Sequence, residues 1–440
     1  MRQSGKKWRR RTLERILRFM ARLVLLRHCP VIIGVTGSVG KSSTKEAVAS
    51  VLGSSMNLRQ SEGNFNNEIG VPLTILQSSS GGSSFARWIA VGFRFLRLAF
   101  FPAKYPDILI LEMGVDRPGD MKYLLEFVPV KIGVVTRIGE SHIAYFGTMA
   151  NIAKEKGRMI SALPEDGFAI LNADDPHVLH MAEKTKAVAL SYGFSEHASV
   201  RADNVVFQAT ENGFGSSFKL NYAGKTIPVR LPQMIARHSI SDALAGAAVG
   251  IALGMNLVDI AQSLESMRSL PGRLRFLPGR SGIGILDDTY NASPVSVRAA
   301  LETLREMPGR RKVVILGDML ELGVNAESEH RLLADDVIGS GAELVILAGR
   351  HMRFLGDGLL KKGFPRGAVM LLPDHDAVSR SLEGILRTGD LVLVKGSRGM
   401  RMEKVVEGLL LRPSEAATVL CCQSPEWKRK EFVAPLEWNN

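Results

Sequence analysis

The chain has 440 residues, of which 45% are hydrophobic and 23% charged, a size and composition that suit two or three folded domains. Of its net charge of +12, residues 1–27 supply +9, from ten Lys or Arg and one acid, Glu14; a single basic arm argues against a nucleic-acid partner. The three cysteines, Cys29, Cys421 and Cys422, have neither metal-ligand spacing nor the pattern of a disulfide framework, which favours a reducing, cytoplasmic setting.

Residues 1–29 are predicted to form a basic, amphipathic helical segment. The helical period places apolar side chains on one face and arginines on the opposite one. The apolar face comprises Leu13, Ile16, Leu17, Met20, Leu23 and Val24, and the basic face comprises Arg11, Arg15, Arg18 and Arg22. A second segment, residues 85–101, combines five Phe and one Trp with Arg87, Arg94 and Arg97 at roughly helical spacing.

Neither segment contains 18 uncharged apolar residues in a row, so no membrane span is predicted. Residues 1–27 and 85–101 could lie on an anionic membrane surface, at the inner face of the membrane. Alternatively, both could cover apolar surface of the protein itself or of a second subunit, with their arginines extending to solvent. Composition leaves both alternatives open.

From Val31 onward, short apolar runs alternate with helical stretches, which predicts an α/β fold with doubly wound, mainly parallel sheets. Pro271 and Gly272 interrupt this pattern, so we expect a central domain over residues 30–270 and a second, Rossmann-like domain over 271–413. Residues 190–230 alternate like a small antiparallel meander, and the tail, 414–440, lacks periodicity and is expected to be loosely ordered. The predicted strands are Val31–Val35, Ile108–Glu112, Ile132–Thr136, Phe168–Asn172, Ile283–Asp287, Val313–Leu316, Leu344–Ala348 and Leu391–Val394.

A glycine-rich stretch between the first strand and the next helix, residues 34–43 (GVTGSVGKSS), has the composition of a phosphate-binding loop. Its backbone N–H groups and the N-terminus of the following helix can converge on an anion. Lys41 is expected at the terminal phosphates of ATP and Ser42 at Mg²⁺, although the glycine spacing departs by one residue from the strict motif. The residues predicted to hold the nucleotide here are Gly37, Ser38, Gly40, Lys41, Ser42 and Ser43.

The longer string GVTGSVGKSSTKE resembles the loop of the Mur ligase family, which has the same offset. Further stretches, in family order, resemble the branch of that family that adds D-alanyl-D-alanine. They are residues 63–72 (GNFNNEIGVP), 111–114 (LEMG), 171–175 (LNADD), 287–294 (DDTYNASP), 316–323 (LGDMLELG) and 395–399 (KGSRG). Chance does not easily produce six such matches in series.

The resemblance implies a P-loop-type central ATPase domain and an ATP-dependent amide ligase of peptidoglycan precursor synthesis. ATP would phosphorylate the carboxylate of a muramoyl peptide, and the amine of D-alanyl-D-alanine would attack the resulting acyl phosphate. Lys41, Arg273 and Mg²⁺ would supply the positive charge that a transferring phosphoryl group requires.

By the same resemblance, Glu112 and His142 are ligands of a second metal ion, and Lys156 is a lysine that CO₂ carbamylates so that it can support this metal. Glu112 also ends a predicted strand, at the edge where open α/β sheets bind ligands. Taken alone, Glu112 and His142 suit solvated loop positions equally well. Carbamylation requires a neutral amine and hence a lowered pKa, and Lys154, on another side of the same helix, is the competing candidate.

The resemblance places Asp288 at the ribose hydroxyls of the nucleotide, and Tyr290 or Asn291 beside its base or phosphates. Where the family has asparagines that contact adenine, residues 237–242 read RHSISD, so Asp242 is expected at the base in a different arrangement. The residues implied to contact substrate are Asn66, Asn67, Glu68 and Lys395.

The matching family branch carries an N-terminal domain for the UDP part of its substrate, whereas only 30 residues precede the first predicted strand here, so this domain is expected to be lacking. A different acceptor on the same scaffold, lipid-linked, folate or poly-amino-acid, is therefore one alternative. A noncatalytic nucleotide-binding scaffold is the other. The combined presence of the predicted catalytic, metal and nucleotide ligands argues against the scaffold.

Overall fold

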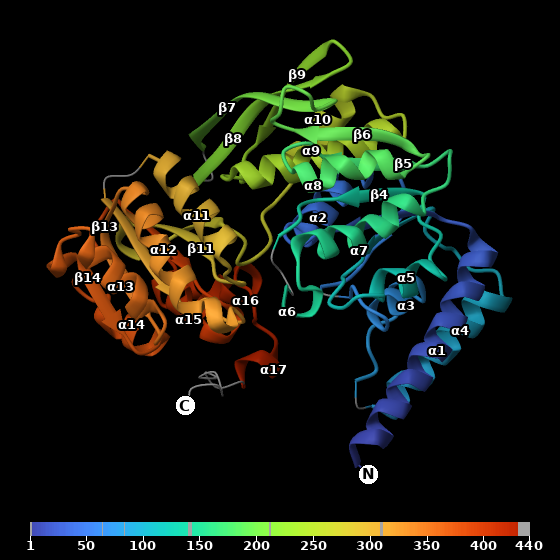
Figure 1. Ribbon diagram of the computed structural model, residues 1–440, viewed down its shortest axis with the longest axis horizontal. Helices are drawn as coiled ribbons and strands as arrows, with labels where there is room; N and C mark the ends of the chain where they lie inside the picture. The colour runs from blue at the N-terminus through green and yellow to red at the C-terminus, as the bar shows by residue number, and fades with distance from the viewer. Residues whose placement is uncertain are drawn as a thin grey trace. The chain divides into compact units, whose positions relative to one another are not determined.

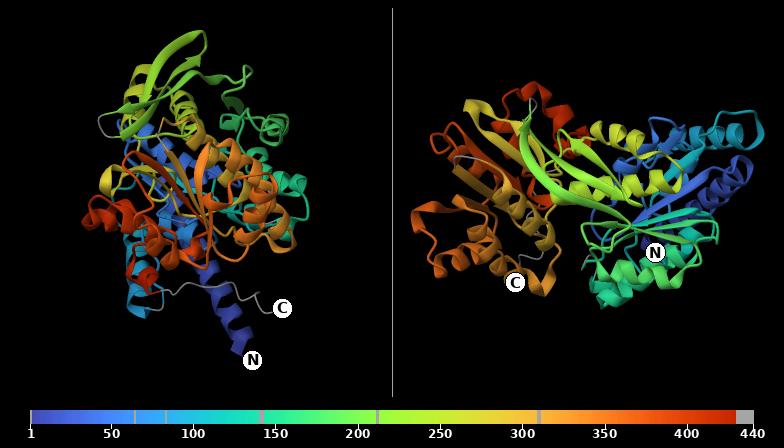
Figure 2. Two further views of the ribbon diagram at one scale, coloured as in Figure 1. Left: turned by 90° about the vertical axis from the view of Figure 1, so that its left-hand side faces the viewer. Right: turned by 90° about the horizontal axis from the view of Figure 1, so that it is seen from above.

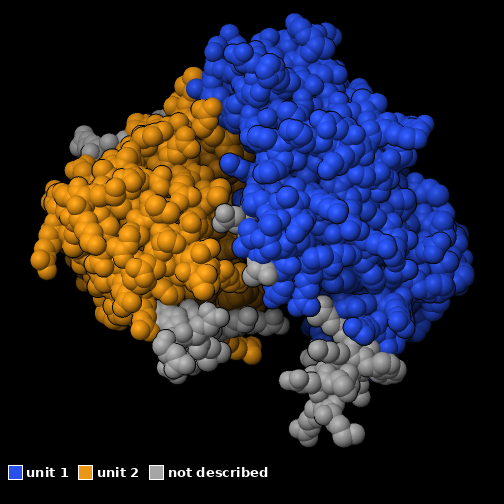
Figure 3. Space-filling view, viewed as in Figure 1, with its two compact units in different colours: residues 1–205, 218–230, 240–267 blue, residues 206–217, 231–239, 268–440 orange. Residues whose placement is uncertain are grey.

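Strands and helices alternate through the residues that this computed structural model describes, which are 2–63, 65–82, 84–139, 143–210, 213–308 and 311–429 (Figure 1). They form two units (Figure 3). The first comprises residues 1–205, 218–230 and 240–267, and the second comprises 206–217, 231–239 and 268–440. Each unit contains a mainly parallel sheet with helices, which confirms the predicted α/β class.

The first sheet has the strand order β2-β3-β1-β4-β5-β6-β7-β8-β9. Its pairs from β2 to β7 are parallel. Strand β1 lies between β3 and β4 and is parallel to both, so the carboxyl ends of these three strands lie at the same edge of the sheet. Open α/β sheets bind ligands at this edge. The strands are β1 Val31–Thr36, β2 Leu58–Gln60, β3 Ile108–Glu112, β4 Ile132–Val135, β5 Phe168–Asn172, β6 Val188–Gly193, β7 Val200–Thr210, β8 Gly213–Tyr222 and β9 Lys225–Leu231.

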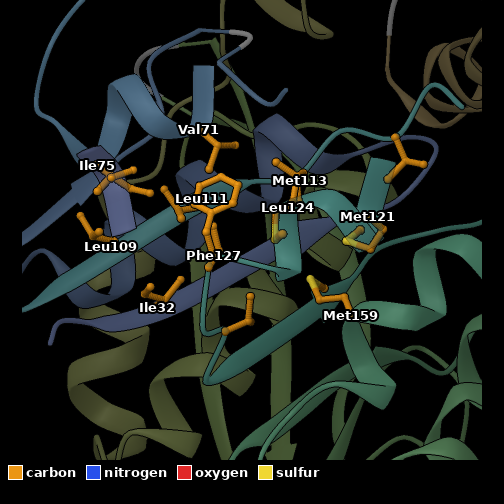
Figure 4. Close-up of a cluster of buried hydrophobic side chains, with 14 of the residues drawn as sticks. Ile32, Val71, Ile75, Leu109, Leu111, Met113, Met121, Leu124, Phe127 and Met159 are labelled. Carbon is orange, nitrogen blue, oxygen red and sulfur yellow. The ribbon is translucent and has the colours of Figure 1, made fainter. Parts of the chain in front are cut away.

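Apolar side chains from β1 and β3 form a buried cluster with side chains from α3, α5 and α7 (Figure 4). Ile32 and Leu109 come from the strands, and Val71, Leu124 and Met159 come from the three helices in turn. The helices described in this part of the chain are α1 Arg2–His28, α2 Lys41–Leu52, α3 Gly70–Ile75, α4 Phe85–Phe100, α5 Asp120–Leu125, α6 Ile143–Phe146, α7 Met149–Ser161, α8 Pro176–Leu179, the short η1 His180–Lys184, α9 Arg237–Ala252 and α10 Leu257–Glu265.

Helix α1 buries one face against the core of the first unit, so the expectation that this segment covers the protein's own apolar surface is correct for that face. Leu17 and Val24 are buried as expected. Ala21 and Leu25 are buried as well, whereas Ile16 is exposed, because the contact face is rotated away from the one that apolar spacing alone defined. Within the described residues, no helix is both long and apolar enough to cross a bilayer.

The second sheet has the order β10-β11-β15-β12-β13-β14, in which only the β10–β11 pair is antiparallel. Its strands are β10 Arg275–Pro278, β11 Gly284–Asp288, β12 Arg311–Gly317, β13 Ala342–Ala348, β14 Val369–Leu372 and β15 Asp390–Lys395. Its helices are η2 Arg280–Gly282, α11 Pro294–Glu306, η3 Gly323–Asn325, α12 Ala326–Gly339, α13 Met352–Lys361, η4 Arg366–Ala368, α14 His375–Ser381, η5 Arg398–Met400, α15 Glu403–Leu409, η6 Pro413–Glu415, α16 Ala416–Val419 and α17 Pro425–Lys428.

The beginning of the tail is more ordered than its sequence suggested. Residues 413–419 form η6 and α16, residues 425–428 form α17, and Ala416 and Leu420 are buried in the core of the second unit. Cys421 lies 3.5 Å from the hydroxyl of Thr289. These contacts explain why residues 414–429 differ from the loosely ordered tail that we expected, whereas residues 430–440 lie outside the described part of the chain.

Candidate active site

The glycine-rich loop joins the carboxyl end of β1 to the N-terminus of α2, as a phosphate-binding loop requires. Gly37 has a φ of +151°, and a Cβ atom there would lie 1.9 Å from Thr136 Oγ1. Gly40, with a φ of +88°, immediately precedes the helix. Thr136 Oγ1 donates a hydrogen bond to the carbonyl of Val39 at 2.6 Å, which braces the loop against the end of β4. Position 37 therefore excludes any side chain.

Lys41 and Ser42 begin α2 at the mouth of this loop. The Lys41 ammonium donates to the carbonyl oxygen of Gly37 at 2.9 Å, so its charge stays at the loop. Ser42 Oγ donates to Glu112 Oε2 at 2.8 Å, and Asn66 Nδ2 donates to Glu112 Oε1 at 3.0 Å. The carboxylate of Glu112 thus contacts both Ser42, which lies 70 residues earlier in the sequence, and Asn66, which lies 46 residues earlier.

The pair of Ser42 and Glu112 suits a hard divalent cation. Glu112 ends β3 and is buried, and its carboxylate lies beside the hydroxyl of Ser42. Hydroxyl and carboxylate oxygens are the ligands that Mg²⁺ prefers, and Mg²⁺ commonly binds through one or two protein groups together with substrate phosphates. His142, the other predicted metal ligand, lies outside the described residues.

Lys156 and Lys154 differ sharply in their surroundings on α7. Lys156 is buried and Lys154 is exposed. The pKa of Lys156 is lowered to about 7, chiefly by burial and also by the neighbouring Lys41 ammonium, against the opposing effects of Asp116 and Glu155. A substantial fraction of the Lys156 amine is therefore neutral near neutral pH, which is the condition for carbamylation.

Three further predicted residues, Asp242, Asn67 and Ser38, make hydrogen bonds in the first unit. Asp242 on α9 accepts a hydrogen bond from Thr44 Oγ1 at 2.5 Å, which ties α9 to α2 beside the loop. Asn67 accepts from the backbone N–H of Gly70 at 3.0 Å, at the start of α3. Ser38 donates to the carbonyl of Gly139 at 3.0 Å, on the loop after β4. Ser43 lies in the first turn of α2, and Glu68 is half-buried near α3.

In the second unit, Asp288 and Lys395 form a buried ion pair across the parallel strands β11 and β15. Lys395 Nζ lies 2.6 Å from Asp288 Oδ2 and also donates to the carbonyl of Asn291 at 2.9 Å. The other carboxylate oxygen of Asp288 accepts from the backbone N–H of Leu274 at 3.2 Å. Burial lowers the pKa of Lys395, and the carboxylate of Asp288 opposes this shift. Sequence reasoning assigned these two residues separately and missed the pair.

Replacing Lys395 by methionine is expected to destabilise the second unit by about 3 kcal/mol, because it leaves the Asp288 carboxylate buried without its counter-charge. The midpoint of denaturant unfolding measures the loss. The double variant Lys395→Met, Asp288→Asn serves as control. It should recover part of the stability, because it also removes the buried carboxylate charge that the single variant leaves unpaired. An unchanged midpoint in Lys395→Met would contradict the pairing.

Arg273 and Tyr290 belong to one aromatic and cationic cluster in the second unit. The guanidinium of Arg273 lies 4.1 Å from the ring centre of Tyr290. Arg398 lies 5.3 Å from the same ring and 4.2 Å from that of Trp427. Sequence reasoning missed Arg398, which the matched stretch 395–399 contained, and Trp427, which stood in the tail that we expected to be loosely ordered.

Comparison with known proteins gives matches along both units. Residues 35–87 and 95–250 match the Mur ligase middle domain, and residues 272–398 match the Mur ligase, glutamate ligase domain. The chain is 30% identical over 383 residues to the UDP-N-acetylmuramoyl-tripeptide--D-alanyl-D-alanine ligase of Bacillus subtilis, covering 87% of this chain and 76% of that protein. Its counterpart in Escherichia coli is also 30% identical, with 86% and 76% covered.

Solved structures agree with these matches. MurF from Acinetobacter baumannii superposes with a TM-score of 0.75 at 25% identity, covering 89% of this chain and 79% of that one. MurF ligase from Thermotoga maritima, in complex with ADP, gives a TM-score of 0.73 at 26% identity, with 90% and 83% covered.

Proposed function

Because the chain belongs to the Mur ligase family and is an ATP-dependent ligase, we propose that it joins D-alanyl-D-alanine to the terminal carboxylate of a UDP-N-acetylmuramoyl tripeptide. The observation that carries this proposal is the similarity to ligases of that name along both units. The glycine-rich loop at the end of β1 supports the proposal because it has the form of a phosphate-binding loop, which an ATP-dependent ligase requires. We also place the reaction in the cytoplasm, as a step of peptidoglycan precursor synthesis.

In the first chemical step, an oxygen of the substrate carboxylate attacks the γ-phosphorus of ATP, and ADP leaves. Backbone N–H groups at the N-terminus of α2 and the ammonium of Lys41 would offset the negative charge of the phosphates. Mg²⁺, held by Ser42 and Glu112, would neutralise charge on the phosphate oxygens. The product of this step is an acyl phosphate.

In the second step, the amine of D-alanyl-D-alanine attacks the acyl carbon, and the tetrahedral intermediate collapses to an amide and inorganic phosphate. We propose that Lys156 is carbamylated and, as an anion, supports the metal next to Glu112; its burial and lowered pKa support this role. Asn66, which donates to Glu112, would hold that carboxylate in place. Asp288, Tyr290 and Asn291 remain our candidates for the nucleoside part of ATP.

Oxygen-isotope transfer tests this mechanism directly. When both oxygens of the substrate carboxylate are ¹⁸O, the attacking oxygen leaves with the phosphate, so each turnover should deliver one ¹⁸O to inorganic phosphate. Mass spectrometry of the phosphate and of the peptide product measures the transfer. Label in AMP instead would indicate an acyl adenylate, and unlabelled phosphate would show that ATP hydrolysis is not coupled through the carboxylate.

A further inference from the structure

A ridge of exposed apolar side chains runs along α4. Phe85, Ile89, Phe93, Leu96 and Phe100 recur every three or four residues, so all five lie on one face of the helix. Phe85 is 79% exposed, Phe93 69% and Phe100 61%. Isolated exposed apolar residues are ordinary, whereas an aligned row of this length marks an interaction surface. We call these five residues the α4 ridge.

The fold of the first unit does not need the α4 ridge. A different face of α4 carries Val91 and Leu98, which are buried in the core, and Trp88 and Phe95 pack against that core. Ser84 caps the N-terminus of the helix by accepting from the backbone N–H of Arg87. The helix is therefore already anchored through another side, and the ridge faces outward.

Helix α1, which contacts α4, carries a second exposed apolar row. Ile16, Phe19 and Leu26 are exposed, and Leu23 is partly exposed between them. The C-terminal ends of the two helices meet, since Arg27 donates to the carbonyl of Ala99 at 2.7 Å (Figures 1 and 2). The stacked rings of His28 and Tyr105, 4.4 Å apart, fix the end of α1 in the same region.

The exposed charges on these two helices are mainly positive, although Arg18 on α1 pairs with Glu126 at 2.6 Å. Arg87 and Arg97 on α4 are exposed, as are Arg15 and Arg22 on α1. Helix α4 has no acidic residue, and the single acid of α1 is Glu14. An apolar row flanked by arginines is complementary to a lipid surface with anionic headgroups, in which aromatic rings enter the interface and guanidinium groups bind phosphates.

We propose that the exposed rows of α1 and α4 dock this protein on an anionic phospholipid membrane. A second copy of the chain fits this surface less well, because a symmetric interface sets like patches against each other and would bring the arginines of both copies together. The docking is peripheral, since no described helix can cross the bilayer. It extends the proposed ligation by giving the enzyme a location, and it does not depend on which substrate is ligated.

Flotation of the full chain with vesicles tests the docking. One set of vesicles contains equal parts phosphatidylglycerol and phosphatidylcholine, and the other contains phosphatidylcholine alone. We expect binding to the anionic vesicles that weakens as salt is added, because exposed charges are screened.

The triple variant Phe85→Ser, Phe93→Ser, Phe100→Ser should bind the anionic vesicles at least tenfold more weakly than the unmodified chain. Arg87→Glu with Arg97→Glu should bind at least about twenty-five-fold more weakly, because each arginine contributes about fivefold and each glutamate adds repulsion.

A matched control replaces exposed apolar residues elsewhere, Val258→Ser, Leu332→Ser and Leu371→Ser, and should bind like the unmodified chain. ATP turnover in vesicle-free solution should be the same for the triple variant and the unmodified chain, which separates loss of docking from loss of catalysis. Failure of the unmodified chain to float with anionic vesicles at low salt would overturn the proposal. So would a dimer in sedimentation that the triple variant abolishes, because the ridge would then belong to a second copy.

Discussion

Lys41→Ala is expected to lower the rate of ADP formation by about a thousandfold, because it removes the cation that the loop holds at the terminal phosphates. The loss should appear mainly in kcat, because the Lys41 charge stabilises the transition state of phosphoryl transfer more than it stabilises bound ATP. Initial rates at saturating ATP, Mg²⁺ and both substrates measure the effect.

The variant should keep its fold, because Lys41 is only half-buried and its ammonium bonds the carbonyls of its own loop. An unchanged thermal unfolding midpoint is the control for that. If Lys41→Ala retained more than a tenth of the activity, the phosphates would have to be held elsewhere.

Lys156→Ala is expected to reduce ligation by at least a hundredfold, because the proposed carbamate would be the anion that supports the metal beside Glu112. Small carboxylic acids such as acetate or formate should restore part of the activity by supplying a carboxylate in the space that the side chain leaves. Lys154→Ala, two residues away and exposed, is the matched control and should be nearly as active as the unmodified chain.

The extent of carbamylation should depend on pH in the way that the pKa of the Lys156 amine sets. With a pKa of about 7, the neutral fraction of this amine rises about tenfold from pH 6 to pH 8 and then levels off. An ordinary lysine would stay almost wholly protonated over that range. At a fixed concentration of dissolved ¹³CO₂, carbon-13 NMR should therefore show a carbamate signal that increases with pH up to about 8. Lys156→Ala should abolish this signal, whereas Lys154→Ala should keep it; the reverse result would exchange the two lysines.

The fold could be predicted largely from local pattern. The buried strands β3 and β5 have the predicted limits, because each is a short apolar run bounded by turn residues. Strands β2 and β14 escaped detection, since they have three and four residues at the edges of their sheets and are half-buried. Such short edge strands owe their conformation to the neighbouring strand rather than to a periodic pattern of their own.

The candidate site was predictable where one local motif carries it, and less so where distant side chains meet. The glycine-rich loop specifies its conformation through Gly37 and Gly40, whose positive φ angles suit glycine. Sequence placed Glu112 at the end of a strand but could not show that Ser42 and Asn66 both bond it. The residues alone also could not distinguish Lys156 from Lys154. Only the packing of α7 shows that Lys156 is buried, with a lowered pKa, whereas Lys154 is exposed.

ADP release, measured with ATP and Mg²⁺ while D-alanyl-D-alanine and UDP-N-acetylmuramoyl tripeptide are added separately and together, tests the central claim most directly. We expect sustained release only when both substrates are present, equal in amount to the peptide product, and almost none with Lys41→Ala. ATP binding without turnover in the presence of both substrates would contradict the proposed reaction and direct attention to another acceptor or to a noncatalytic role.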